Sequence, residues 1–224
     1  GPEVGLRCGV AVVPDGGSPT VVTVEEKGIL HLRLSVEGRE IHAARPWLGD
    51  NAVLRLSRAL TATASRFEQL RGDLPEGGDH WYTTFSPTIV GTSNKTINCL
   101  PGDASALVDI RFTPPHRSDD IEGMVRDSVG EGIDVEILVA AEPTHLAPDP
   151  LFLDVAQKHA GESITLVRAS GGSDARFIAH GGMPVILSRP RVGNLHGLDE
   201  WIDIGSMIRF YQVCEDYVLR KLLS

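Results

Sequence analysis

The sequence predicts an α/β protein in which part of a parallel-rich α/β domain is interrupted by a ferredoxin-like insertion. Residues 28–141 follow the order strand, helix, strand, strand, helix, strand, which is the βαββαβ pattern of split βαβ folds. Residues 1–27 and 142–224 instead alternate short β-branched runs with helical periodicities, as helix-covered parallel sheets do. We therefore expect two domains: 28–141 as one continuous module, and 1–27 with 142–224 as the other.

The composition disfavours several classes of partner. A formal net charge of -9 over 224 residues, without a basic cluster, would repel a phosphate backbone, so we expect no nucleic-acid partner. No apolar run approaches the roughly 18 residues of a membrane span, and the start lacks a signal pattern, so we expect no membrane partner and a cytoplasmic location. Cys8, Cys99 and Cys214 are scattered, which favours neither a disulfide framework nor a thiolate metal site.

The first segment predicts two short strands joined by a turn. The apolar run Leu6–Val13 ends at Pro14-Asp15-Gly16-Gly17, and Thr20–Val24 forms a second β-branched run. Asp15 therefore follows the end of a strand, where α/β proteins often place functional side chains. Taken alone, Asp15 is better explained as a turn residue that bonds its own backbone.

The inserted module is predicted from alternation and helical spacing. Apolar residues at every second position over Leu30–Val36 predict a strand with one buried face. The other elements follow in order: a helix capped by Asp50 that ends before Gly72, a strand over Thr88–Val90, an alternating strand over Ala104–Phe112, a helix capped by Ser118, and a strand over Val135–Val139. This module could bury one sheet face under two helices and fold alone.

The carboxyl-terminal segment returns to the α/β pattern. It contains a helix over Leu151–His159, a strand over Ile164–Val167, a short helix between two glycine pairs, a buried strand over Pro184–Leu187, and a final helix capped by Asp203. A loop after the buried strand ends in His196. Since ligands gather beyond the carboxyl ends of strands in open α/β sheets, His196 lies where chemistry is expected.

Four stretches resemble the two-zinc aminoacylase and peptidase family that includes succinyl-diaminopimelate desuccinylase, acetylornithine deacetylase and carboxypeptidase G. The first runs from Gly171 to Trp201: a Gly-Gly-Ser-Asp-Ala-Arg turn, a strand, then a histidine. The others are the acidic turn before a lysine-glycine pair, a glycine-histidine-proline motif followed by Gly49-Asp50-Asn51-Ala52, and an Asn-x-x-Pro motif followed by Asp-x-Arg.

The resemblance implies a role for each motif. Asp15 and His196 would each bind one of two divalent metal ions, zinc or cobalt. His42 would be the catalytic donor to the oxyanion, in many members acting from the partner subunit. The substrate carboxylate would be held by Asn98 and Arg111 and by Gly171 and Arg176.

Simpler interpretations of these residues stay open. His42 could be a solvated loop residue, and Asp109 with Arg111 an ordinary salt bridge on an exposed strand face. Asp174 and Arg176 could only brace their loop.

The implied activity is metal-dependent hydrolysis of the amide bond of N-acyl amino acids or small peptides, by a deacylase that dimerises through the inserted module. In the family a preceding half carries a histidine-x-aspartate pair, a bridging aspartate and a glutamate pair, which this chain does not contain. We expect the chain to be inactive alone. The alternative is a non-catalytic dimerisation or binding module derived from such an enzyme.

Overall fold

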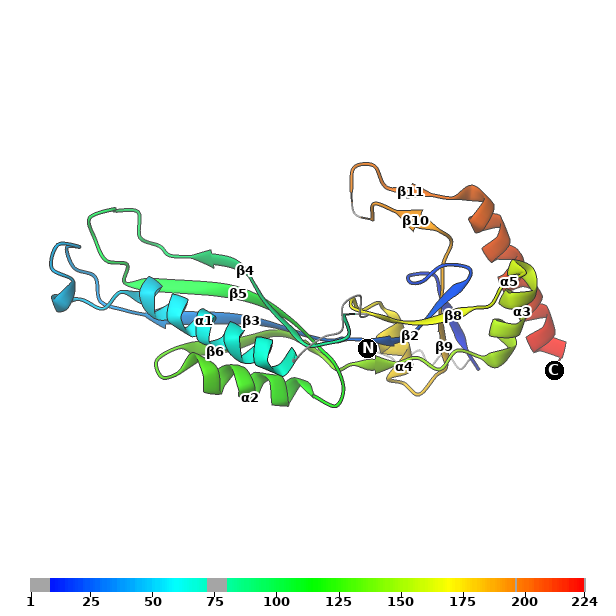
Figure 1. Ribbon diagram of the computed structural model, residues 1–224, viewed down its shortest axis with the longest axis horizontal. Helices are drawn as coiled ribbons and strands as arrows, with labels where there is room; N and C mark the ends of the chain where they lie inside the picture. The colour runs from blue at the N-terminus through cyan, green and yellow to red at the C-terminus, as the bar shows by residue number, and fades with distance from the viewer. Residues whose placement is uncertain (1–8, 72–79, 196, 224) are drawn as a thin grey trace, which may run out of the picture. The chain divides into compact units, whose positions relative to one another are not determined.

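The structure, a computed structural model, describes residues 9–71, 80–195 and 197–223 and divides into two compact units (Figure 1). The inserted unit spans residues 27–143, and the outer unit combines residues 1–26 with 144–224. Leu6 to Cys8 of the first predicted strand, Gly72 and His196 lie outside the described residues. In the part of the chain that is described, no helix combines the length and apolar character needed to cross a membrane.

The inserted unit has the predicted βαββαβ order. Its elements are β3 (Gly28–Glu37), α1 (Ala52–Arg71), β4 (Thr84–Gly91), β5 (Asp103–Phe112), α2 (Ser118–Val129) and β6 (Asp134–Ala141), with a 3-10 turn at Pro46–Leu48. The strands form an antiparallel sheet in the order β4-β5-β3-β6. The fold-class prediction is confirmed for this unit.

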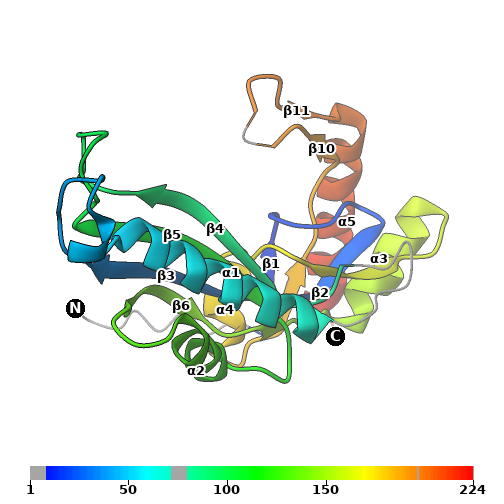
Figure 2. The same cartoon turned by 60° about the vertical axis from the view of Figure 1, so that its left-hand side comes forward.

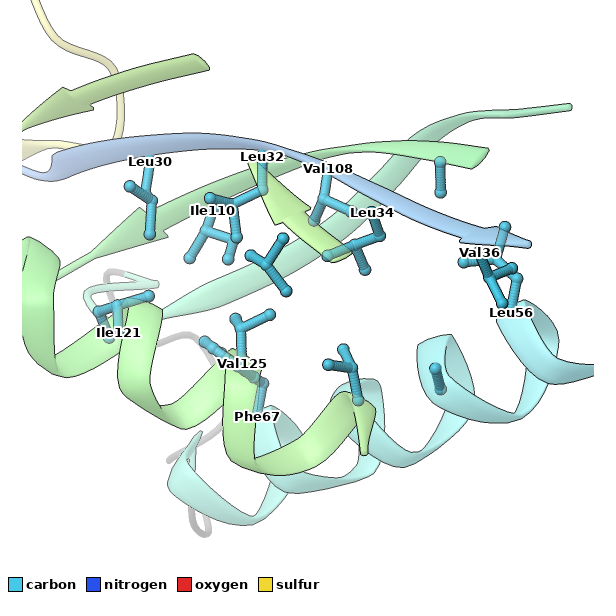
Figure 3. Close-up of a cluster of buried hydrophobic side chains, with 14 of the residues drawn as sticks. Leu30, Leu32, Leu34, Val36, Leu56, Phe67, Val108, Ile110, Ile121 and Val125 are labelled. Atoms are coloured by element: carbon cyan, nitrogen blue, oxygen red, sulfur yellow. The ribbon is translucent and has the colours of Figure 1, made fainter. Parts of the chain in front are cut away.

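One face of this sheet forms the larger hydrophobic core. Leu30, Leu32 and Leu34 of β3 are fully buried, as the alternation predicts, and pack with Ile110 and Val108 of β5. Figure 3 shows these side chains pointing from the strands toward Ile121 and Val125 of α2 and toward α1. Figures 1 and 2 show both helices on this same face. The other face carries the polar side chains of His31, Arg33 and Asp109 together with half-buried Leu107.

Two predicted helix caps are wrong by one residue. The Asp50 carboxylate accepts a hydrogen bond from Arg55 Nη1 at 2.8 Å, and the side-chain oxygen of Asn51 instead accepts the Leu54 N–H at 3.1 Å. Asn51 is therefore the cap of α1, because its side chain satisfies a free N–H of the first turn. Ser118 is the first residue of α2, and its hydroxyl donates to Glu142 Oε1 at 2.6 Å.

The outer unit contains a mixed sheet and two packed helices. Its elements are β1 (Ala11–Val13), β2 (Val21–Glu26), β7 (Thr144–His145), α3 (Pro150–Ala160), β8 (Thr165–Ala169), α4 (Ala175–Ala179), β9 (Val185–Leu187), β10 (Val192–Gly193), β11 (Trp201–Ile202) and α5 (Ile204–Leu223). Strands β1 and β9 are parallel, as are β2 and β8, whereas β2 is antiparallel to β7 and β9. The sheet is thus mixed, with two parallel pairs.

Helices α3 and α5 pack against each other through aromatic side chains. The rings of Phe152 and Tyr217 meet edge to face, with centroids 5.5 Å apart. The Tyr217 hydroxyl donates to Asp149, whose carboxylate also accepts the Leu151 N–H and so caps α3. At α5 the predicted cap is confirmed, since Asp203 Oδ1 accepts the Ser206 N–H. These caps fix where both helices begin.

Shortening a core leucine of the inserted sheet should strongly destabilise this unit. We expect Leu32→Ala to lower the free energy of unfolding by about 2–5 kcal/mol, because it leaves a cavity in a close-packed core. Urea denaturation measures the change. The matched control is Arg33→Ala, which removes an exposed ion pair to Glu136 on the opposite face and should cost no more than about 1 kcal/mol. Equal, small effects would contradict the packing described.

Candidate active site

Asp15 lies at the carboxyl end of β1, beside the strand that leads to His196. Strand β1 pairs with β9 in parallel, with Val13 opposite Leu187, and Asp15 follows as an exposed residue. The turn is tied to the chain that leaves β9, because the Ser188 hydroxyl donates to the Ser18 carbonyl at 2.7 Å. The Asp15 turn therefore lies beside the chain that leaves β9, whereas His196, which comes after β10, lies outside the described residues.

The turn after Asp15 requires glycine. Gly17 has a φ of +67°, and a Cβ there would lie 2.0 Å from the Val21 carbonyl oxygen. Ser18 and Val21 exchange two backbone hydrogen bonds, which reverse the chain into β2. The Asp15 carboxylate is thus presented by a tight turn with little conformational freedom.

The donor types at these strand ends suit a divalent cation. Zinc is bound in proteins by carboxylate oxygen and imidazole nitrogen, which are the groups of Asp15 and His196. Among the described residues no three His, Cys, Asp or Glu side chains come together as a metal site. The described part of this chain therefore offers the exposed Asp15 carboxylate as a ligand and does not form a closed coordination shell.

A buried glutamate, Glu26, lies close enough to this turn for the charge of Asp15 to act on it. None of the sequence motifs assigns a role to this residue. Glu26 ends β2 with 3% of its surface exposed, and Oε1 accepts the Ser173 N–H at 2.8 Å. Burial raises the pKa of Glu26; hydrogen bonds from Ser173 and the charge of Arg176 oppose the shift, and the charge of Asp15 adds to it. Simple alternation along β2 does not predict this burial, because the register of β2 against β8 shifts between Thr23 and Glu25.

Arg176 belongs to the same group of side chains, whereas Gly171 has no comparable contacts. Arg176 lies in α4, with its guanidinium carbon 4.9 Å from the Phe177 ring centroid. Its Nε and Nη1 are buried and find no hydrogen-bond partner among the described residues. Gly171 is exposed, and a Cβ there would have no neighbour within 4 Å. Asp15, Glu26 and Arg176 therefore form an electrostatically coupled cluster in the outer unit.

In the inserted unit, backbone pairing brings His42 beside Asn98. The Ala43 N–H donates to the Asn98 carbonyl at 2.8 Å, and the Leu100 N–H donates to the Ile41 carbonyl at 2.8 Å. The Ala44 N–H donates to His42 Nδ1 at 3.1 Å. A neutral imidazole that accepts at Nδ1 carries its proton on Nε2, so the exposed edge of this ring is a hydrogen-bond donor.

Arg111 does not lie beside His42 and Asn98 within one chain. It pairs with Ile29 near the start of β3, whereas His42 follows the end of that strand and Asn98 precedes β5. Between Asp103 and Arg111, β5 rises by roughly 27 Å at strand spacing. The Arg111 Nε and Nη2 donate to the Asp109 carboxylate at 2.8 and 2.9 Å, so the ion pair left open as a simpler interpretation is present.

Asp109 links this ion pair to a histidine. His31 Nε2 lies 2.9 Å from Asp109 Oδ2. The Arg111 hydrogen bonds hold the pKa of the Asp109 carboxyl below its ordinary value, with a smaller contribution from His31. With Nε and Nη2 engaged by Asp109, Arg111 has its Nη1 side left for a ligand.

Comparison with known proteins assigns the family. Residues 24–133 match the M20 peptidase dimerisation domain. The chain is 30% identical over 220 residues to a succinyl-diaminopimelate desuccinylase from Granulibacter bethesdensis, covering 90% of this chain and 55% of that protein. It is also 30% identical over 194 residues to the enzyme of that name from Acidiphilium cryptum, covering 83% of this chain and 50% of the relative.

The chain belongs to the M20 peptidase family. The family resemblance of the sequence motifs is thereby confirmed. Solved structures of M20-like fold agree: aminopeptidase PepT from Bacillus cereus has a TM-score of 0.74 at 18% identity, covering 93% of this chain and 55% of PepT. The M20 family metallo-carboxypeptidase Sso-CP2 from Sulfolobus solfataricus has a TM-score of 0.73 at 13% identity, covering 95% of this chain and 63% of that one. This M20 chain spans about half the length of the curated relatives it matches.

The hydrogen bonds and ion pairs of Asp109 should make the stability of this M20 chain fall at acidic pH. Because the folded-state pKa of Asp109 is depressed, its stabilisation is present above the unfolded pKa near 4 and is lost as the pH falls through the folded pKa. We expect Asp109→Asn to be less stable than wild type near pH 6, and the difference to shrink below about pH 4. Urea denaturation between these pH values measures it.

The control for this series is Ser105→Ala, an exposed position of the same strand, which should follow the wild-type pH profile. A difference between wild type and Asp109→Asn that stays constant from neutral to acidic pH would show that charge pairing does not stabilise the fold at this position.

Proposed function

We propose that this chain is part of a metal-dependent amidohydrolase that cleaves the amide bond of N-acyl amino acids or small peptides. The single observation that carries the proposal is the parallel pairing of β1 with β9, which sets the Asp15 turn beside the chain leading to His196. The similarity to proteins named succinyl-diaminopimelate desuccinylase supports a deacylase. On this proposal Asp15 and His196 each bind one of two divalent ions, zinc or cobalt.

The metal ions would polarise the scissile carbonyl and activate water. The chain's own residues would bind the substrate and stabilise the tetrahedral intermediate. The oxyanion of the tetrahedral intermediate needs a donor aimed at charge that develops only in the transition state. His42 can supply it, because the Ala44 N–H holds Nδ1 as an acceptor and leaves the proton on Nε2. Asn98, held beside His42 by the backbone, would add a side-chain donor.

The substrate carboxylate would be held by arginine. Arg176 carries a guanidinium in the same unit as Asp15, and Arg111 has one nitrogen beyond those bound to Asp109. A planar guanidinium matches a carboxylate with two parallel hydrogen bonds, which suits either residue to this role. Gly171 would contribute only its backbone, since it carries no side chain.

We further propose that the active form is a homodimer through the inserted unit. Within one chain His42 and Asn98 lie at the end of the sheet opposite Arg111, so one copy cannot bring all three to one small ligand. A second copy would allow His42 of one chain to act in the site that contains the other chain's Asp15. The match of residues 24–133 to a dimerisation domain supports this arrangement.

The test uses the longest polypeptide that the gene encodes around this chain, assayed with zinc or cobalt on N-succinyl and N-acetyl amino acids. We expect His42→Ala to lower kcat by about 100- to 1,000-fold with the fold intact, as loss of an oxyanion donor does. The control His116→Ala removes a half-buried imidazole from the same unit and should retain near wild-type activity. Full activity in His42→Ala would contradict the assigned role.

The 224-residue chain alone should hydrolyse none of these substrates, because the family motifs assign it one ligand for each metal ion, Asp15 and His196. Hydrolysis by the purified chain with added zinc or cobalt would contradict this. If the longer polypeptide forms dimers but cleaves no amide under any metal condition, the alternative of a non-catalytic dimerisation module replaces the enzyme proposal.

A further inference from the structure

We propose that Glu26 is a positioning residue: its buried carboxyl group fixes the turn Gly171–Ala175 and thereby the direction of the Arg176 guanidinium. The inference rests on the proposed role of Arg176 in holding the substrate carboxylate, and it adds a residue that neither the motifs nor the family match singles out. All the contacts that carry it lie within the outer unit.

A continuous path of hydrogen bonds leads from Glu26 to α4. Glu26 Oε1 accepts the Ser173 backbone N–H at 2.8 Å. Ser173 Oγ in turn accepts the Ala175 N–H at 3.2 Å, which begins α4. Ala175 is fully buried, which fixes the start of α4. The side chain of the next residue, Arg176, therefore projects from a fixed backbone position.

The base of this path is rigid. Glu26 is the last residue of β2 and lies in register with Thr144 of β7 and with Ala169 of β8. It is therefore held in a sheet while the segment that it binds is a turn between β8 and α4. A turn gains order from a bond to a strand, because the strand's backbone is already fixed by its ladder.

The charges also favour a positioning role. A buried carboxyl group is costly unless its oxygens are hydrogen-bonded or paired, and Glu26 Oε2 has no partner among the described residues. The charge of Arg176 opposes the rise in the Glu26 pKa, and the buried Nε and Nη1 of Arg176 are likewise without hydrogen bonds among the described residues. Attraction from Glu26 would hold the guanidinium in one orientation.

The test is nuclear magnetic resonance of the 224-residue chain labelled with nitrogen-15, with succinate as the carboxylate probe. Glu26→Gln keeps an acceptor for the Ser173 N–H but removes the charge. We expect it to stay folded, to shift the Ser173 and Ala175 amide signals and the Arg176 Nε–H signal, and to weaken succinate binding at least tenfold. The matched control Glu25→Gln, the neighbouring half-buried acid paired with His145, should leave these signals and the affinity unchanged.

A second variant keeps the proposal testable if Glu26→Gln unfolds. Ser173→Ala removes the hydroxyl and keeps the backbone N–H, and it should shift the Ala175 and Arg176 Nε–H signals. Unchanged Arg176 signals in the folded variants would overturn the positioning role. If the Arg176 signals depend on Glu26 but the wild-type chain does not bind succinate, positioning stands and the carboxylate role of Arg176 in the proposed function fails.

Discussion

The parallel pairing of β1 with β9 determines where the Asp15 turn lies in the outer unit. Three residue pairs, from Ala11 with Val185 to Val13 with Leu187, set two strands that are far apart in sequence side by side and pointing the same way. Parallel neighbours end at the same edge of a sheet, so the groups that follow them share one side. The Ser188 bond to the Ser18 carbonyl then ties the two exits together, which gives Asp15 a defined setting.

The inserted unit obeys a different constraint, which is to bury one face of an antiparallel sheet under two helices. Its polar face is left to carry the Asp109 network, while the loops beyond one end carry His42 and Asn98. A sheet of this length separates the two groups by more than a small substrate can span. This separation within the inserted unit is the physical basis of the proposed dimer, in which a second copy would supply His42.

The sequence was sufficient to predict what local patterns determine. The alternation of Leu30, Leu32 and Leu34 predicted their burial, and the order of elements in the inserted unit followed from such patterns. The predicted caps at Asp50 and Ser118 were wrong because these side chains bind other partners, Arg55 and Glu142. Those partners come close to them only in the folded chain. Tertiary packing determines such partners, so the periodicity of the sequence cannot predict them.

The features of the candidate site also divide into those that sequence motifs predict and those that only the folded structure reveals. Motifs predicted Asp15, His42, Asn98, Arg111, Gly171 and Arg176, but not that Glu26 is buried beneath the Ser173 turn. That contact joins residues 147 positions apart, so it needs the fold to be seen. The hydrogen bond from the Ala44 N–H to His42 could not be predicted from the sequence either, because it depends on the conformation of a loop that the sequence pattern does not specify.

The most direct measurement of the central claim is the location of zinc in crystals of the longest polypeptide that contains this chain, by anomalous scattering at the zinc edge. The account predicts a zinc peak about 2.0–2.2 Å from an Asp15 carboxylate oxygen, and a second zinc bound by the His196 imidazole within a few ångströms of the first. Zinc bound elsewhere, with Asp15 and His196 facing away from each other, would contradict it.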